Sequence, residues 1–239
     1  MPDPADLDEA GLIEAYRVPG GRHLRVNFVA SLDGAVTVDG RSAGLGSPGD
    51  RRIFHVLRAL ADVMLVGHGT AAAEGYRPVI ADSSVGRLRA SIGRPPTASI
   101  AVVSKRASLD PTSGLVTGAV SPTILVTCAS ADSGRREALA AAGVTVLVCG
   151  DDEVDLRLAL DRLAGLGHEH VVCEGGPTLF REALTAGVVD EFDLSIAPAL
   201  VGGEYRLLDG LANVVRLDLH QLLEEDGTLF ARYAAPEAR

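Results

Sequence analysis

Short apolar runs alternate with stretches of helical pattern along most of this 239-residue chain. Helical pattern is found at 48–60, just after Thr70, at 132–142, at 153–165 and from about Thr178 onward. The apolar runs, several of them rich in β-branched residues, predict strands at 24–30, 62–66, 99–103, 123–127, 144–148 and 170–173. Strands joined by helical crossovers form a mainly parallel sheet with helices on both faces. The order of signals therefore predicts an α/β fold.

The C-terminal part of the chain is richer in strands. Strands are expected at 189–196, 214–223 and 228–233, and the "EEDG" stretch between the last two is typical of a hairpin. We therefore expect an antiparallel edge on the mostly parallel sheet.

No linker and no internal repeat divides the chain. We expect one domain over 1–239, with 1–22 as an N-terminal extension. The segments 82–97 and 105–121 are rich in Ser, Gly, Pro and Arg, and we expect them to be the most mobile.

Charge and hydropathy narrow the possible partners. The formal net charge of −10 argues against a broad nucleic-acid-binding face. The acidic N-terminus lacks the features of a secretory signal, and no apolar stretch is long enough to span a bilayer. We expect a soluble, cytoplasmic protein with a globular core, since 47% of the residues are hydrophobic.

The cysteines and histidines do not have the spacing of a metal site. Cys128, Cys149 and Cys173 lie in or beside apolar runs, without a CxxC or Cys/His pattern, which fits a reducing compartment. The histidines of the 168–170 stretch alternate with Glu169 and are expected in a solvated loop. No metal is expected.

The stretch "VVCEGGPTLF" at 171–180 joins the end of a predicted strand to the start of a predicted helix. Gly175 and Gly176 would let backbone N–H groups approach a ligand closely, and the start of a helix favours negative charge. Pro177 suits the first helical turn. The stretch predicts either an anion site or a tight turn whose glycines serve packing alone.

The dinucleotide fingerprint of a Rossmann fold, G-x-G-x-x-G after the first strand, is missing. The first predicted strand leads into "SLDG" (31–34), and the later turn Gly67-His68-Gly69 lacks the third glycine. Any dinucleotide must be held in another way.

Four segments together resemble the pyrimidine reductases of riboflavin biosynthesis, which are related in fold to dihydrofolate reductase. They are "VNFVASLDGAVT" (26–37), "RSAGLGSPGDRRIFHVLRALADVMLVGHGTAAAEGYRP" (41–78), "AVVSKRA" (101–107) and "VVCEGGPTLFREALTAGVVDEFDLSIAPALVGG" (171–203). The resemblance implies NADPH-dependent reduction of the ribosyl group of a 5-amino-6-ribosylamino-pyrimidine phosphate to ribityl. The zinc deaminase often fused to this reductase needs H-x-E and P-C-x-x-C, which this sequence lacks, so no deaminase domain is expected.

The resemblance also implies where NADPH is held. The glycine loop would grip the pyrophosphate, Thr70 and Glu74 would contact the cofactor, and the basic Ser104-Lys105-Arg106 turn would suit a 2′-phosphate. Thr70 is equally suited to capping a helix, and the basic turn to an ordinary solvated loop. The full set of implied cofactor-binding residues is Ala30, Thr70, Glu74, Ser104, Lys105, Arg106, Gly175, Gly176, Pro177, Thr178, Leu179 and Phe180.

On the substrate side, the resemblance implies Ser42, Arg58, Arg77 and Glu174. A guanidinium group such as that of Arg58 suits a sugar phosphate, and the Glu174 carboxylate suits ribose hydroxyls or amino groups. If one group supplies a proton, Asp33 or Glu174 is the candidate by proximity. Asp33 either contacts the substrate or caps its own turn.

Two departures from the family leave the acceptor open. Many relatives carry a lysine at the position of Asn27 and an aromatic residue near Gly44. A dihydrofolate or pterin reductase and a non-catalytic NADPH-binding protein therefore remain alternatives. The resemblance and the strand-rich C-terminus also predict a homodimer.

Overall fold

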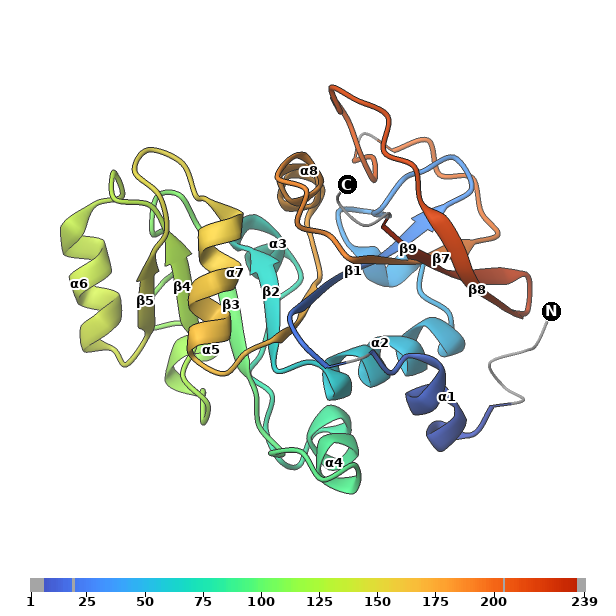
Figure 1. Cartoon of the computed structure of the whole chain (residues 1–239), viewed down its shortest axis with the longest axis horizontal. Helices are drawn as coiled ribbons and strands as arrows, with labels where there is room; N and C mark the ends of the chain where they lie inside the picture. Colours follow the sequence, from blue (N-terminus) through green and yellow to red (C-terminus); the bar gives the residue numbers. More distant parts are fainter. Residues whose placement is uncertain (1–6, 19, 204, 236–239) are drawn as a thin grey trace.

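The computed structural model describes residues 7–18, 20–203 and 205–235. Nine strands of this described part form one sheet in the order β5-β4-β3-β2-β6-β1-β7-β9-β8 (Figure 1). The pairs from β5 to β7 are parallel, whereas β9 is antiparallel to both β7 and β8. The predicted α/β fold with an antiparallel C-terminal edge is therefore confirmed. The strands are β1 (His23–Ser31), β2 (Val63–Gly67), β3 (Ser99–Val103), β4 (Ile124–Thr127), β5 (Thr145–Val148), β6 (His170–Cys173), β7 (Glu191–Ala197), β8 (Asp218–Glu225) and β9 (Thr228–Ala234).

Helices pack on both faces of the sheet. Buried side chains of α1, α2, α4, α5 and α6 contribute to one apolar core, and those of α7 and α8 contribute to the other. Figure 1 shows α1, α2 and α4 together along one side of the strands. Among the described helices, none has both the length and the apolar character needed to cross a bilayer. They are α1 (Glu9–Ala15), the 3₁₀ turn η2 (Ser42–Gly44), α2 (Pro48–Leu60), α3 (His68–Ala73), α4 (Ser84–Ser91), α5 (Gly114–Thr117), α6 (Ser133–Ala141), α7 (Leu156–Gly165) and α8 (Pro177–Thr185).

The strand order places a site at one edge of the sheet. The chain leaves β1 toward α2 and enters β2, yet β6 lies between these two strands. Because the strands are parallel, the segments that follow β1, β2, β3 and β6 all emerge at the same edge. Ligands of open α/β sheets bind at such an edge, where connections diverge.

The helix α2 begins where its sequence signals predict. The Ser47 hydroxyl accepts a hydrogen bond from the Asp50 N–H, and Pro48 occupies the first turn. Ile53, Val56, Leu57 and Leu60 recur at helical spacing and are buried against the sheet.

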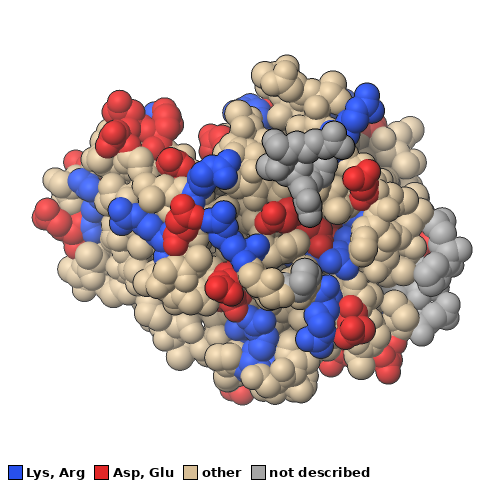
Figure 2. Space-filling view, viewed as in Figure 1, with Lys and Arg blue, Asp and Glu red and all other residues tan. Residues whose placement is uncertain are grey.

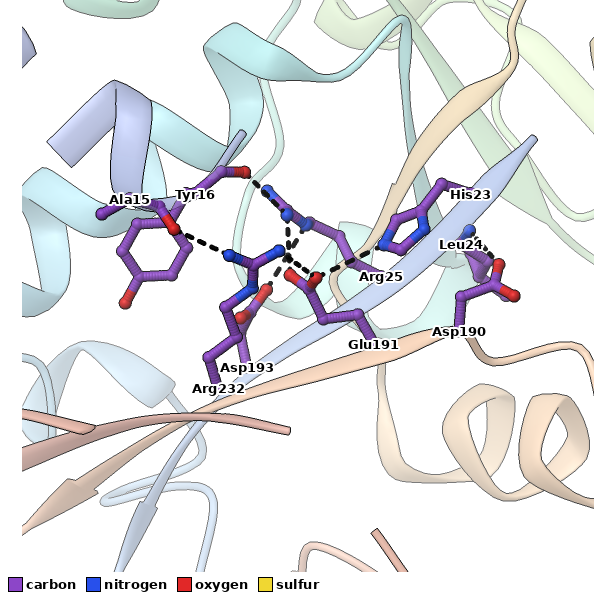
Figure 3. Close-up of polar contacts among 9 residues, drawn as sticks. All are labelled: Ala15, Tyr16, His23, Leu24, Arg25, Asp190, Glu191, Asp193 and Arg232. Carbon is purple, nitrogen blue, oxygen red and sulfur yellow. Dashed lines mark hydrogen bonds and ion pairs between the residues drawn. The ribbon is translucent and has the colours of Figure 1, made fainter. Parts of the chain in front are cut away.

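The N-terminal extension is part of the core. Leu12, Ile13 and Tyr16, in and after α1, are buried. Two buried arginines of the sheet hold the end of α1: Arg25 donates to the Tyr16 carbonyl at 2.9 Å, and Arg232 donates to the Ala15 carbonyl at 2.7 Å (Figure 3). No helix was predicted here, because the stretch is short and acidic.

The same two arginines neutralise buried carboxylates. Glu191 pairs with Arg25 and with Arg232, each at 2.6 Å, and Asp193 lies 3.5 Å from the Arg25 Nε (Figure 3). Burial raises the pKa of Asp193. Burial also tends to raise the pKa of Glu191. The His23 hydrogen bond and the two guanidinium charges outweigh this effect, so the pKa of Glu191 is lower than usual. The cluster thus favours one charged and one protonated carboxyl group.

The segments expected to be the most mobile contain buried structure. Within 82–97, α4 carries the buried Arg89, whose Nη1 donates to the Ala61 carbonyl at 2.5 Å and whose Nε donates to the Pro95 carbonyl at 2.8 Å. Arg89 thereby satisfies carbonyl groups at the end of α2. Leu109 and Leu115 are buried within 105–121. Composition did not indicate this buried structure, because one arginine and a few leucines decide the packing of the two segments.

The strand predicted at 214–223 lies further along the chain. β8 runs from Asp218 to Glu225, and Val214 is 86% exposed. The hairpin fixes this register, since Glu225 pairs with Thr228 across a turn in which Asp226 and Gly227 have φ of 49° and 80°. Positive φ at both residues is what a two-residue hairpin turn requires.

Candidate functional site

A large cleft opens where the segments after β1, β2, β3 and β6 meet. Its volume is about 1790 Å³, more than the roughly 300–1,000 Å³ that suits one drug-sized ligand. The cleft therefore has room for a dinucleotide and a second ligand side by side.

An ion pair forms the wall of the cleft between α2 and β6. The Arg58 Nε and Nη2 donate to the two carboxylate oxygens of Glu174 at 2.6 and 2.7 Å, and the Tyr76 hydroxyl donates to Glu174 at 2.6 Å. Such a two-pronged pair fixes geometry as well as charge. Its Arg58 side chain is only 15% exposed and its Glu174 side chain 3%, so the pair is largely withdrawn from solvent.

Two aromatic rings flank the same guanidinium group. The Arg58 Cζ lies 4.3 Å from the Phe54 ring centroid and 5.2 Å from that of Tyr76. Burial and the neighbouring Glu174 raise the pKa of Tyr76 well above its usual value. Tyr76 therefore keeps its proton and acts as a hydrogen-bond donor.

The glycine turn after β6 packs against neighbouring segments so closely that side chains are excluded. Gly175 has φ of 81°, and a Cβ there would lie 2.5 Å from the Phe28 ring. A Cβ at Gly176 would lie 2.5 Å from the Thr70 Oγ1. The Gly67 N–H donates to the Gly175 carbonyl at 2.7 Å and joins this turn to the one after β2. The Gly175–Gly176 peptide bond is cis.

The helix α8 starts directly at the cleft. Gly176 is its N-cap and Pro177 is its first residue, and a glycine cap has no side chain to accept from the helix N–H groups. Gly176, Pro177, Thr178 and Leu179 all line the cleft. The free N–H groups and the helix dipole make this a favourable position for an anion such as a diphosphate.

The far end of the cleft, beyond β3, is basic. Ser104, Lys105 and Arg106 line it, and Lys105 forms an ion pair with Glu153. A second hollow of about 240 Å³ is shared by Lys105, Arg106 and Arg135. Figure 2 shows Lys and Arg interleaved with Asp and Glu across the face it draws, so the basic character belongs to local sites.

The structure brings most of the predicted residues to one cleft. Of the sites implied by the resemblance, Ala30, Asp33, Gly175 and Phe180 are outside the cleft wall, although Gly175 lies in the turn behind it. Those that line the wall are Ser42, Arg58, Thr70, Glu74, Arg77, Ser104, Lys105, Arg106, Glu174, Gly176, Pro177, Thr178 and Leu179.

Asp33 holds a loop together. Its carboxylate accepts from the Ser31 hydroxyl at 2.6 Å and from the N–H groups of Val201 and Gly202 at 3.0 and 2.8 Å. The Ser31 hydrogen bond, followed by those of the two N–H groups, lowers the pKa of Asp33. A carboxylate held in its charged form accepts hydrogen bonds and is poorly suited to donating a proton.

The Gly-rich loop before α2 explains one departure from the family pattern. A Cβ at Gly44 would lie 2.8 Å from the Val38 Cβ, so this loop has no space for an aromatic side chain at that position. The loop is tied to the cleft because the Ser42 N–H donates to the Glu74 carboxylate at 2.8 Å.

Several residues of the cleft wall were missed from the sequence. Tyr76 lies in "EGYRP", where the resemblance implied a role for Arg77 alone. Phe54 and Asp50 lie on α2, where an aromatic residue and a first-turn aspartate look structural. His55 also lines the cleft, and burial, then Arg58 and Arg51, lower its pKa. Within the described residues, no cluster of three or more His, Cys, Asp or Glu side chains could hold a metal ion.

The comparisons with known proteins agree with this geometry. Residues 22–228 match the family model described as the RibD C-terminal domain. The chain is 34% identical over 204 residues to the 2,5-diamino-6-ribosylamino-4(3H)-pyrimidinone 5′-phosphate reductase of Methanothermobacter thermautotrophicus, covering 82% of this chain and 90% of that protein.

Solved structures show the same fold. A pyrimidine reductase-like protein from Corynebacterium diphtheriae has a TM-score of 0.80 and 28% identity, covering 91% of this chain and 93% of that one. Dihydrofolate reductase from Enterococcus faecalis has a TM-score of 0.51 at 12% identity, covering 90% and 97%, and shows the fold alone. With the family model matching most of its length, this chain belongs to the RibD C-terminal domain family, whose members include the pyrimidine reductases of riboflavin biosynthesis.

Proposed function

We propose that this protein is an NADPH-dependent reductase that converts the ribosyl group of an aminopyrimidine ribosyl phosphate to ribityl in riboflavin biosynthesis. The relative from Methanothermobacter is named for such a substrate. One observation carries the proposal: the turn after β6 places Glu174, paired with Arg58, directly beside the glycines that open α8. The carboxylate proposed to bind ribose hydroxyls and the helix start proposed to bind the diphosphate thus follow each other closely in the chain, and both line the same cleft.

The cofactor fits the side chains and the spaces that this chain provides. Gly176 caps α8 without a side chain of its own, so no capping side chain occupies the N–H groups to which a diphosphate would bind. When bound, reduced nicotinamide supplies a hydride. Thr70 lies against Gly176 and would help to position the diphosphate.

The choice of NADPH over NADH is supported by the basic end of the cleft. Arg106 lines both the cleft and the adjoining smaller hollow, and Arg135 lines that hollow as well. Guanidinium groups form strong charge-assisted bonds to phosphate. We assign the 2′-phosphate to this place.

The substrate is assigned to the end of the cleft near α2. Glu174 offers carboxylate oxygens to ribose hydroxyls, while its pair with Arg58 engages only two of the five guanidinium N–H groups. Arg51 and Arg77 also line the cleft and supply charge for the sugar phosphate. Ser42 lies beside Glu74 at the opening of the same space.

The first test is turnover by the purified protein. Incubation with NADPH and 2,5-diamino-6-ribosylamino-4(3H)-pyrimidinone 5′-phosphate should consume NADPH, followed by loss of absorbance of the reduced nicotinamide. Parallel reactions contain dihydrofolate or no acceptor. Turnover of dihydrofolate alone would reassign the enzyme to pterins, and NADPH binding without any turnover would indicate a binding protein.

The glycine at the start of α8 provides a test of the diphosphate site. Gly176→Ala places a methyl group 2.5 Å from the original position of the Thr70 Oγ1, so Thr70 or the start of α8 must shift. Both are proposed to contact the diphosphate, so the shift should weaken NADPH binding. Loss of one charge-assisted bond weakens binding by about tenfold or more. Titration calorimetry with NADPH measures the change. Gly165→Ala is the matched control, because its Cβ meets nothing within 4 Å; equal affinities for both variants would contradict the assignment.

Arg106 provides a test of cofactor choice. Arg106→Ala should raise the KM for NADPH by about 10- to 100-fold and leave the KM for NADH nearly unchanged, because only NADPH carries the 2′-phosphate. Steady-state kinetics with both cofactors give the ratio. Arg87→Ala, an exposed arginine outside the cleft wall, is the control. If the KM rose equally for NADPH and NADH, Arg106 would not act through the 2′-phosphate.

We also propose that the protein is a homodimer that pairs through the connection between β7 and β8 and through β8 itself. Leu200 is 78% exposed, Val214 86% and Leu219 54%, and exposed apolar residues of this kind favour an interface. Light scattering should give twice the mass of one chain. The double substitution Val214→Asp with Leu219→Asp should give monomers; a monomeric parent protein would rule the dimer out.

A further inference from the structure

The two oxygens of the Glu174 carboxylate are bound unequally. Its Oε1 atom accepts one hydrogen bond, from the Arg58 Nε at 2.6 Å. Its Oε2 atom accepts two, from the Arg58 Nη2 at 2.7 Å and from the Tyr76 hydroxyl at 2.6 Å. An ionised carboxylate has about four acceptor positions, shared between its two oxygens. Within the described residues, the contacts therefore fill Oε2 and leave one acceptor position on Oε1.

The backbone at the end of α3 fixes where Tyr76 lies. Gly75 has φ of 66°, and its N–H donates to the Ala72 carbonyl at 3.3 Å. The Tyr76 N–H donates to the Ala71 carbonyl at 3.0 Å. These two bonds form the Schellman motif, which ends a helix with a left-handed residue. The Tyr76 side chain thus reaches the ion pair from the end of α3, whereas the two members of the pair come from α2 and from the turn after β6.

Packing and protonation make Tyr76 a donor to Glu174. The Tyr76 ring packs against the apolar core that includes α2, and its centroid lies 5.2 Å from the Arg58 Cζ. Burial, followed by the Glu174 charge, raises the pKa of Tyr76, so the hydroxyl keeps its proton. Because the ring is held by these contacts, its hydroxyl stays directed at Oε2.

The unequal binding limits how Glu174 can hold a ligand. The last torsion of a glutamate side chain is soft, but the two bonds from Arg58 fix the plane of the carboxylate. Tyr76 adds a further donor to one oxygen only. With Oε2 filled, Glu174 cannot bind two neighbouring sugar hydroxyls through both of its oxygens. It can accept from one further group, at Oε1.

We propose that Tyr76 is a positioning residue for the substrate, holding Glu174 in the orientation that offers a single acceptor, Oε1, to the ribosyl group. The inference rests on the proposed reductase function, in which Glu174 binds that group. The ligand atom at Oε1 belongs to a donor, a hydroxyl or an amino group, because a carboxylate paired with arginine only accepts hydrogen bonds. Tyr76 acts through Glu174 and does not itself touch the reacting atoms.

The first test is Tyr76→Phe, which removes the hydroxyl and keeps the ring. Without its second donor on Oε2, the Glu174 carboxylate can leave the orientation that suits the substrate. The KM for 2,5-diamino-6-ribosylamino-4(3H)-pyrimidinone 5′-phosphate should rise about tenfold, as expected for one hydrogen bond to a charged group. The kcat should stay close to the parent value, because only binding is affected. Steady-state kinetics at saturating NADPH give both constants.

A second tyrosine provides the matched control. Tyr233→Phe removes the same atom from β9, outside the cleft wall, and should keep the parent KM and kcat. The affinity for NADPH, measured by calorimetry, should be equal in all three proteins. A merely structural role of Tyr76 would reduce the fraction of folded protein and so lower kcat without changing KM. That result, or a KM equal to that of the parent, would overturn the proposal.

A double-mutant cycle tests whether Tyr76 acts through Glu174. Glu174→Gln should itself raise the KM, and adding Tyr76→Phe to it should change the KM by about twofold or less. A further tenfold rise in the Glu174→Gln background would overturn the proposal. Because Glu174→Gln leaves Arg58 without its charged partner, circular dichroism first checks that both Gln variants fold. If they do not, the KM and kcat of Tyr76→Phe decide the question.

The outcomes also distinguish this inference from the function on which it rests. An active parent enzyme with an unchanged KM in Tyr76→Phe would overturn the role of Tyr76 and leave the reductase intact. A parent protein that binds NADPH but reduces no aminopyrimidine ribosyl phosphate would overturn both.

Discussion

The pair between Arg58 and Glu174 connects the two halves of the cleft. Arg58 belongs to α2, which packs on the sheet through its apolar side, and Glu174 directly follows β6 in the middle of the sheet. Removing one partner of such a buried pair typically costs about 3–5 kcal/mol, because the other charge is left without compensation. The pair therefore fixes the distance between α2 and the glycine turn that follows Glu174, and with it the space in which two ligands can meet.

The acidic residues of the site illustrate how one type of side chain can serve several purposes. Asp33 accepts four hydrogen bonds and holds a loop, Glu174 aligns an arginine, and burial raises the pKa of Asp50 in the cleft wall. The carboxyl group is the same in each, and its neighbours decide whether it accepts, pairs or retains a proton. The chemistry of the cleft thus depends on packing around the acids more than on their number.

Sequence reasoning recovered the parallel strands closely. Strands at 99–103 and 170–173 were predicted at the bounds that the structure has, because strands buried on both faces appear as continuous apolar runs between turn residues. The edge strand β8 was placed too early, since a half-exposed strand has weaker patterning and its register depends on the hairpin.

The candidate site could be predicted from the sequence only in part, for a similar reason. The glycine turn, Arg58 and Glu174 could be found because they lie in segments that resemble a known family. The pair itself joins residues 116 positions apart, and only the folded chain shows that Tyr76 completes it. Arg89 and Arg25 look like surface residues in the sequence, and their burial depends on carbonyl groups supplied by distant segments.

The anchoring of α1 has a consequence for how this protein can be shortened. The family model starts at residue 22, beyond α1, which suggests at first that the preceding residues are dispensable. Yet Arg25 and Arg232 lie inside the sheet and direct N–H groups to carbonyl oxygens at the end of that helix. A polypeptide trimmed to the family boundary would keep the pairs of both guanidinium groups with Glu191 but would remove the carbonyl partner of each. The buried N–H groups would then need water or another acceptor. The helix α1 therefore covers part of the core, a role that the boundary of the family model does not reveal.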